Sequence, residues 1–121
     1  MNWTMAEVSE MYSKSEHTLR YYDNIKLIPG VIRDDRGVRL FTDDAVGWMR
    51  YIISFRSTGM PIKDVRKYIE LTETGNDTLP TRIEMLKNQA EKVDQQIAQL
   101  QSQREIILDK LHKYQSGEWK D

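Results

Sequence analysis

The sequence predicts a mostly helical fold in two parts: a small head that includes one β-hairpin, and a long C-terminal helix of the coiled-coil type. Between Leu79 and Tyr114, apolar residues recur in strict four-three alternation, with one polar interruption. That alternation is the seam of a coiled coil. Residues 1–72 instead show short helical stretches separated by proline, glycine and polar breaks, as in a compact domain.

With 121 residues, the chain has room for one small domain and an extension. We expect a head at residues 1–72, a linker at 73–78, a dimerisation coiled coil at 79–115 and a tail at 116–121. The formal net charge of −1 does not by itself indicate nucleic acid. No segment has the pattern of a signal peptide or a membrane span, so we expect a cytoplasmic protein with no membrane partner.

The first two helices are predicted from their caps. Thr4 with Glu7 three residues later is a capping box, and the helix that it opens should end near Tyr12. Ser15 can cap a second helix after a short polar break. Two short helices joined by about three polar residues form a helix-turn-helix pattern.

A small hairpin and two further helices follow. The β-rich runs Val31–Arg33 and Val38–Phe41 flank a turn that ends in Gly37, which predicts a β-hairpin, or wing. Thr42 caps a third helix, and Pro61 lies in the first turn of a fourth. The head is therefore predicted to be a winged helix-turn-helix with a small β-hairpin wing.

The C-terminal repeat predicts a homodimer. A lone helix cannot bury an apolar stripe of about five heptads, so the seam needs a partner helix, most simply from a second copy of the chain. Arg104 interrupts the seam and is interpreted as setting the register or the oligomer state, not as a binding residue. The residues predicted to form the dimer interface are Ile83, Leu86, Ala90, Val93, Ile97, Leu100, Ile107 and Leu111.

Three motifs together indicate a family. Thr18–Asp23 reads TLRYYD, Gly37–Phe41 reads GVRLF, and Arg56–Met60 reads RSTGM. In this order and spacing they resemble the MerR family of bacterial transcription regulators, over about residues 4–72. The resemblance implies an antiparallel dimer on promoter DNA. It also implies a mechanism in which the regulator bends and untwists a long promoter spacer so that RNA polymerase can engage it.

The chain departs from that family at particular positions. Val38 stands where the wing usually has an aromatic residue, and Ser13 stands where glycine is common in the turn. The RSTGM stretch is nearest to the subgroup that responds to aldehydes and thiol stress, in which a cysteine often lies shortly before it. Here Ser54 occupies that region and the chain has no cysteine, so we expect no thiol-based sensing.

The predicted DNA-binding residues lie on the second helix and on the wing. Glu16, His17 and Arg20 are long polar side chains near the helix N-terminus, where base edges are usually contacted. Arginine and tyrosine also bind phosphates, and for Tyr22 both core packing and DNA contact stay open. The full set is Lys14, Ser15, Glu16, His17, Thr18, Arg20, Tyr21, Tyr22, Arg33 and Arg39.

No other chemistry is indicated. The sequence shows no catalytic constellation, phosphate-binding loop or Cys/His cluster, so we expect no enzyme, metal site or cofactor. Trp48, Tyr51 and Phe55 are weak candidates for an effector site, with core packing the stronger interpretation. Two alternative functions stay open: an architectural DNA-bending factor, and an adaptor that uses a MerR-like head to bind another protein.

Overall fold

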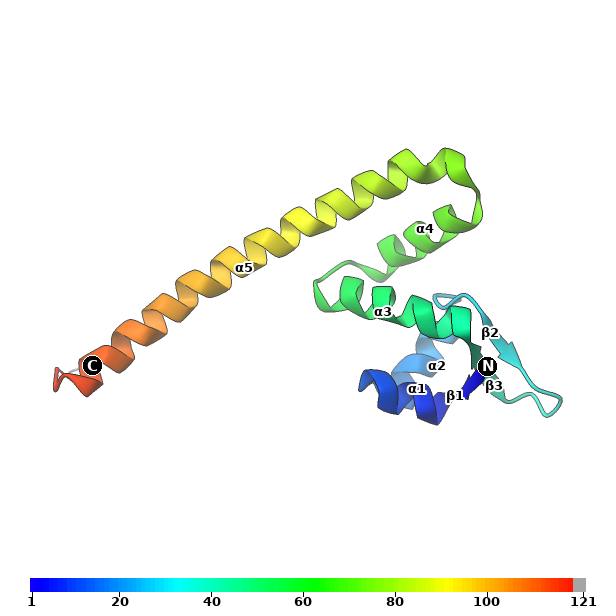
Figure 1. Ribbon diagram of the computed structural model, residues 1–121, viewed down its shortest axis with the longest axis horizontal. Coiled ribbons are helices and arrows are strands. Elements are labelled where there is room, and N and C mark those ends of the chain that lie inside the picture. Colours follow the sequence, from blue (N-terminus) through cyan, green and yellow to red (C-terminus); the bar gives the residue numbers. More distant parts are fainter. Residues whose placement is uncertain (119–121) are drawn as a thin grey trace. The chain divides into compact units, whose positions relative to one another are not determined.

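The structure is a computed structural model that describes residues 1–118 (Figure 1). It divides into two compact units, Met1–Met85 and the chain from Leu86 onward. Of the tail predicted at 116–121, residues 119–121 lie outside the described residues. The elements, in chain order, are β1 (Asn2–Thr4), α1 (Met5–Tyr12), α2 (Glu16–Asn24), β2 (Val31–Arg33), β3 (Arg39–Thr42), α3 (Asp43–Ser57), α4 (Ile62–Glu73), the 3₁₀ helix η1 (Asn76–Thr78) and α5 (Leu79–Gln115).

The caps predicted for α1 and α2 are confirmed. The Thr4 hydroxyl accepts from the Glu7 N–H at 3.1 Å, and the Glu7 carboxylate accepts from the Thr4 N–H at 2.9 Å. The Ser15 hydroxyl accepts from the Thr18 N–H at 3.0 Å. Between the helices Ser13 is left-handed, with φ 54°, a conformation that glycine adopts more easily. These local bonds fix where each helix of the helix-turn-helix begins and ends.

The predicted hairpin is confirmed, but it belongs to a three-stranded antiparallel sheet in the order β1-β3-β2. β1 was not predicted. Its residue Trp3 pairs with Phe41 on one side of β3, and Val31 of β2 pairs with Phe41 on the other. The third strand begins at Arg39, one residue later than predicted, because the Val38 N–H donates to the Asp34 side chain within the turn.

The junction between the sheet and α3 depends on Thr42. Its hydroxyl accepts from the Ala45 N–H at 3.3 Å, which confirms the predicted cap, and donates to the Gly30 carbonyl at 2.7 Å. Gly30 has φ +87°, and a Cβ there would lie 2.6 Å from the Thr42 hydroxyl oxygen. Pro61 precedes α4 as its N-cap, not in its first turn as predicted.

One hydrophobic core joins α1 to α4 with the sheet (Figure 1). Each of the helices α1, α2, α3 and α4 contributes at least one buried side chain, and β3 contributes Phe41 for the sheet. The buried core residues are Val8, Leu19, Tyr22, Leu27, Ile28, Phe41, Ala45, Met49, Ile52, Phe55, Met60, Val65 and Ile69.

The long C-terminal helix is confirmed as one uninterrupted element, with Pro80 at its second residue, where a missing N–H is tolerated. Within the described part of the chain, no helix combines the length and the apolar character needed to cross a membrane.

Candidate nucleic-acid interface

Helix α2 separates its polar and apolar side chains. Glu16, His17 and Arg20 are exposed, whereas Leu19 is fully buried and Tyr22 is 8% exposed. Residues three and four positions apart are neighbours on a helix, so Arg20 lies beside both Glu16 and His17, and the three exposed side chains form one polar surface on the N-terminal half of α2. That surface contains the side chains predicted to meet base edges.

The two tyrosines of the TLRYYD motif have different environments. Tyr21 is 47% exposed, whereas Tyr22 belongs to the core. Their ring centroids lie 6.0 Å apart with the ring planes inclined by 47°. The structure therefore confirms core packing for Tyr22, and its contact with DNA stays a prediction.

A hollow of about 370 Å³ lies between the N-terminal ends of α1 and α2 and the wing. It brings Arg20 of α2 and Arg33 of β2 to the same concave surface, although they are distant in the sequence. Helix N-termini carry partial positive charge, so both the arginines and the helix ends favour an anion there. The lining residues are Thr4, Met5, Ala6, Glu16, Arg20, Arg33, Gly37, Val38 and Arg39.

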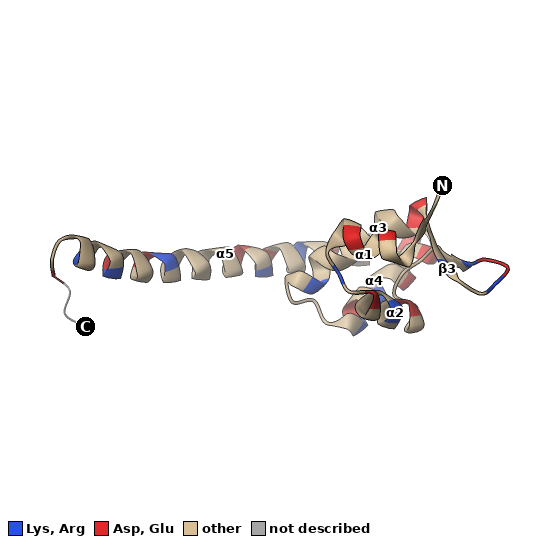
Figure 2. Ribbon diagram, turned by 90° about the horizontal axis from the view of Figure 1, so that it is seen from below, with Lys and Arg blue, Asp and Glu red and all other residues tan. Residues whose placement is uncertain are grey.

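The turn of the wing is held by its own side chains. One carboxylate oxygen of Asp34 accepts from the N–H groups of Arg36 and Val38, both at 2.9 Å. Arg33 donates from Nη1 to the Gly37 carbonyl at 2.7 Å, and its side chain is exposed. Figure 2 shows both signs of charge on the hairpin loop. The tip is therefore shaped locally and is not a purely basic arm.

Arg39 has hydrogen-bond partners on α2 that the sequence pattern did not predict. Its Nε donates to Asp23 Oδ2 at 2.7 Å, and its Nη2 donates to Asn24 Oδ1 at 2.6 Å. The side chains of Arg39 and Asp23 are only 16% and 15% exposed. The guanidinium of Arg39, which was predicted to contact DNA, is thus hydrogen-bonded to two residues of α2. The signal was present in the sequence, as an acid in TLRYYD and a base in GVRLF.

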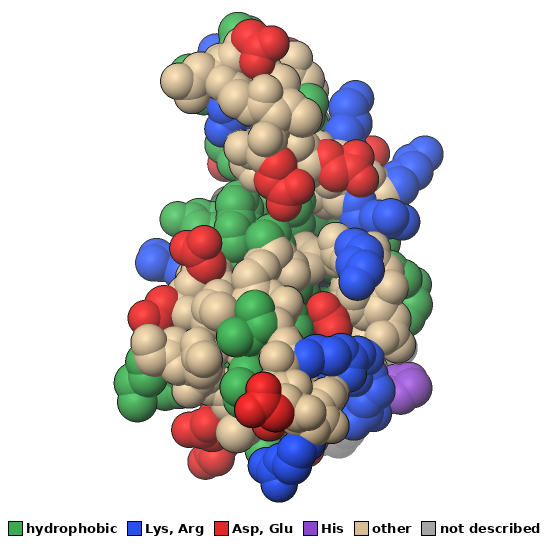
Figure 3. All heavy atoms as spheres, turned by 90° about the vertical axis from the view of Figure 1, so that its right-hand side faces the viewer, with side chains coloured by type: hydrophobic (Ala, Val, Ile, Leu, Met, Phe, Trp, Pro, Cys, Tyr) green, Lys and Arg blue, Asp and Glu red, His purple; other side chains and the backbone are tan. Residues whose placement is uncertain are grey.

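A second group of basic residues was missed. Lys63, Arg66 and Lys67 of α4 are all exposed, and their spacing of three and four places them on one face of that helix. The apolar spacing of α4 predicts a core helix and does not by itself single out these three basic residues. Figure 3 shows Lys and Arg side chains gathered on one side of the view, with acidic and hydrophobic side chains more frequent on the other.

Two carboxyl groups in the head have altered acidity. The pKa of the Glu7 carboxyl group is lowered, first by its hydrogen bond with the Thr4 backbone N–H and second by its interaction with the Thr4 side chain. The hydrogen bond from the Trp3 indole, followed by the N-terminal ammonium, lowers the pKa of Asp43. Both groups lie at helix starts, where an ionised carboxylate is favoured.

The aromatic residues proposed for an effector do not form one site. Trp48 and Tyr51 meet edge to face at 6.0 Å beside an open hollow of about 290 Å³ at the start of α3. Phe55 is 7% exposed, lies outside that hollow and packs on Tyr68 at 5.3 Å. Phe55 is therefore a core residue. Ser54, in the region of the subgroup's cysteine, is exposed and its hydroxyl donates to the Arg50 carbonyl.

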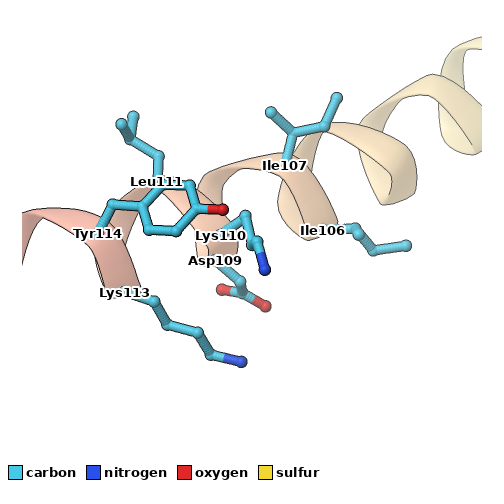
Figure 4. Close-up of a pocket in the computed structure, with 7 residues that line it drawn as sticks. All are labelled: Ile106, Ile107, Asp109, Lys110, Leu111, Lys113 and Tyr114. Atoms are coloured by element: carbon cyan, nitrogen blue, oxygen red, sulfur yellow. The ribbon is translucent and has the colours of Figure 1, made fainter. Parts of the chain in front are cut away.

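The predicted seam of α5 is largely exposed within one chain. Ile97 is 49% exposed, Leu100 64% and Ile107 67%. Figure 4 shows Ile107 and Leu111 on the same side of the helix, with Lys113 pointing away from them. Among the described residues, no three His, Cys, Asp or Glu side chains gather as a metal site requires.

The chain is similar to known transcriptional regulators with a helix-turn-helix head. An "Uncharacterized HTH-type transcriptional regulator" of Haemophilus influenzae is 37% identical over 97% of this chain and 87% of its own length. A crystal structure of HiNmlR, described as a MerR family regulator lacking the sensor domain and bound to promoter DNA, has a TM-score of 0.87. It is 36% identical and covers 98% of this chain and 94% of its own.

A MerR family regulator from Bacillus thuringiensis has a TM-score of 0.86 at 30% identity, covering 94% of this chain and 100% of its own. Residues 3–72 match the family described as MerR HTH family regulatory protein, and residues 46–109 match the one described as MerR, DNA binding. From its motifs, its head and these matches, the chain belongs to the MerR family of helix-turn-helix transcriptional regulators.

Proposed function

We propose that the chain works as a homodimer that binds promoter DNA, with α2 in the major groove and the wing on the adjacent backbone. The observation that carries this is the exposed polar surface of α2, Glu16, His17 and Arg20, next to the arginine-lined hollow. A helix of the second position in a helix-turn-helix reads base edges from its N-terminal half. A similar regulator whose structure includes promoter DNA supports the same mode of binding.

Within this interface, the side chains divide by task. His17 and Glu16 are proposed to read bases, and Arg20 and Arg33 to hold a phosphate in the hollow that they share. Lys14, Ser15, Thr18 and Tyr21 complete the predicted contacts around α2. The exposed Lys63, Arg66 and Lys67 of α4 extend the positive surface, within the segment that matches the DNA-binding family.

The dimer is proposed from α5. Its seam residues keep the four-three spacing on both sides of Arg104, and the larger ones are 40–67% exposed in one chain. Covering such a stripe with a second copy removes apolar area from water, at roughly 25 cal/mol per Å². Two heads joined in this way would contact two half-sites of one operator.

The proposed regulatory step is distortion of the promoter. A dimer that fixes the separation of two heads favours the DNA shape in which both half-sites are reached, and RNA polymerase then engages the promoter spacer. This acts on the bacterial chromosome, so we place the protein in the cytoplasm and assign it no catalytic role. Because the chain has no cysteine, the proposed states respond to DNA or to noncovalent ligands and not to thiol oxidants such as diamide.

The test measures the binding constant of the protein for the DNA upstream of its own gene, over a series of salt concentrations. We expect Arg20→Ala to lower the slope of log Kobs against log salt by about 0.9, the contribution of one phosphate contact. His17→Ala should change the preferred base at one position per half-site while leaving the slope unaltered. Lys87→Ala, on the exposed side of α5, is the matched control for removal of one positive charge.

Binding of a random duplex as tightly as the upstream DNA would favour an architectural DNA-bending factor instead. No binding to either duplex at low salt would favour a protein adaptor.

A further inference from the structure

The ion pair between Arg39 and Asp23 joins two elements that are proposed to contact DNA. Arg39 is the first residue of β3, and Asp23 lies in the last turn of α2. Across the hairpin Arg39 pairs with Arg33, at the end of the ladder that adjoins the turn. The bridge therefore holds the turn end of the wing, not its base, against the reading helix.

The geometry of the bridge restrains orientation as well as distance. Two different nitrogens of one planar guanidinium donate to acceptors on two successive residues, Asp23 and Asn24, at 2.7 and 2.6 Å. A fork with two fixed donors resists rotation, which a point charge such as a lysine ammonium does not. Asp34 and Arg33 hold the turn itself through their own hydrogen bonds, so the bridge joins α2 to a wing whose turn is already braced.

Charge and burial argue against a direct phosphate contact by Arg39. Its side chain is 16% exposed, and its charge already faces the carboxylate of Asp23. Arg20 and Arg33, by contrast, are exposed at the same hollow. Arg39 lines the same hollow, but its Nε and Nη2 are already bonded to Asp23 and Asn24, so a phosphate placed there would be held by the two exposed arginines.

We propose that Arg39 and Asp23 are positioning residues, which set the wing at a fixed angle to α2 before DNA is bound. This rests on the proposed function, in that both elements contact the same duplex. Prior ordering of the wing removes part of the entropic cost of binding, because the DNA does not have to immobilise a mobile hairpin. The acid of TLRYYD and the base of GVRLF then serve one purpose.

The first test needs no DNA. Because the chain has no cysteine, Arg36→Cys places a single spin label at the exposed tip of the wing, and Glu70→Cys places a control label on α4. We expect Asp23→Asn and Arg39→Lys each to increase the mobility of the wing label and to leave the α4 label unchanged. An immobile wing label in both variants would overturn the proposal. A change at both labels would also overturn it, since it would indicate general loosening of the head.

The second test separates positioning from contact. Arg39→Lys keeps the charge but not the fork, so a phosphate ligand would tolerate it while a positioning residue would not. We expect Arg39→Lys, Asp23→Asn and the double variant each to weaken binding about tenfold, with the double no worse than either single, and with an unchanged salt slope. Arg20→Ala, which should lower the slope, is the matched contact control.

Normal binding by Arg39→Lys together with a lower slope for Arg39→Gln would show that Arg39 is a phosphate ligand and overturn the inference. If the parent protein bound no promoter DNA, the proposed function would fail, and the wing label would still decide whether the bridge fixes the wing. Thermal melting of each variant by circular dichroism verifies that the head is folded at the assay temperature.

Discussion

The first 85 residues and the part of α5 that follows them place apolar side chains in opposite environments. In the first unit, Leu19, Leu27 and Phe41 are fully buried. In the second, Leu100 and Ile107 are about two-thirds exposed. The first unit therefore has a core of its own, whereas the larger apolar side chains of α5 in the second unit are exposed within the described residues. The same residue types stabilise a fold in one region and favour association in the other.

A charge placed among the apolar seam residues of α5 is the most direct test of whether these residues favour association. Ile97→Asp places two carboxylates in the proposed interface, and we expect it to weaken dimerisation by at least about a hundredfold, roughly 3 kcal/mol. Sedimentation equilibrium over a concentration series measures this. Gln99→Asp, one residue from the seam on an exposed position, is the matched control. A parent protein that sediments as a stable folded monomer would refute the dimer.

The second prediction contrasts two leucines. Leu27→Ala removes a fully buried side chain and should lower the free energy of unfolding of the head by about 2–5 kcal/mol. Leu100→Ala, at a site 64% exposed, should leave that unfolding nearly unchanged and instead raise the dimer dissociation constant. Urea unfolding is followed by tryptophan fluorescence with Trp119→Phe in parent and variants, so that Trp3 and Trp48 report on the head. Equal effects of the two substitutions on unfolding of the head would contradict the view that Leu27 stabilises the head and Leu100 serves dimerisation.

The third prediction contrasts two glycines. Gly30→Ala puts a Cβ 2.6 Å from the Thr42 hydroxyl oxygen at φ +87°, and should destabilise the head by about 1–3 kcal/mol. Gly47→Ala, within α3 and with nothing within 4 Å of its Cβ, should stabilise it by about 0.5–1 kcal/mol. Urea titrations of both variants measure the change in the free energy of unfolding, which should have opposite signs in the two.

The smallest effect concerns pH. The hydrogen bonds from Thr4 lower the pKa of Glu7 in the folded head, so this carboxylate adds stability above the pKa of the unfolded chain. That contribution is lost as the pH falls through the folded value. Glu7→Gln should therefore flatten the pH dependence of stability below about pH 4. Glu10→Gln, at an exposed position of the same helix, is the matched control for removal of one carboxylate.

Local signals in the sequence predicted much of this fold. The caps at Thr4, Ser15 and Thr42 are short-range hydrogen bonds between residues three apart, so the sequence pattern contains them completely. The heptad spacing in the same way predicted one long helix. Strand β1 could not be predicted, because three residues carry no alternation and pair with β3, some forty residues later.

The candidate site was predicted less completely, for a related reason. Residues on the exposed face of α2 followed from helical spacing, but spacing alone could not tell which of Tyr21 and Tyr22 is buried. Nor could it place Arg39 beside Asp23, sixteen residues away, because that meeting depends on how the sheet packs against α2. Motif resemblance named both charged residues without assigning them to each other.

The contacts of Thr42 have a consequence for synthesis of the chain. This residue pairs with Asn2, bonds to Gly30 and caps α3, so three distant parts of the head meet at one position. A ribosome makes the chain from its N-terminus, so Asn2, Gly30 and the start of α3 can meet at this position only after residue 42 has emerged. We therefore expect a nascent chain cut before residue 42 to be digested by protease and one extended through α4 to resist, because the core of the head also needs the buried residues of α3 and α4.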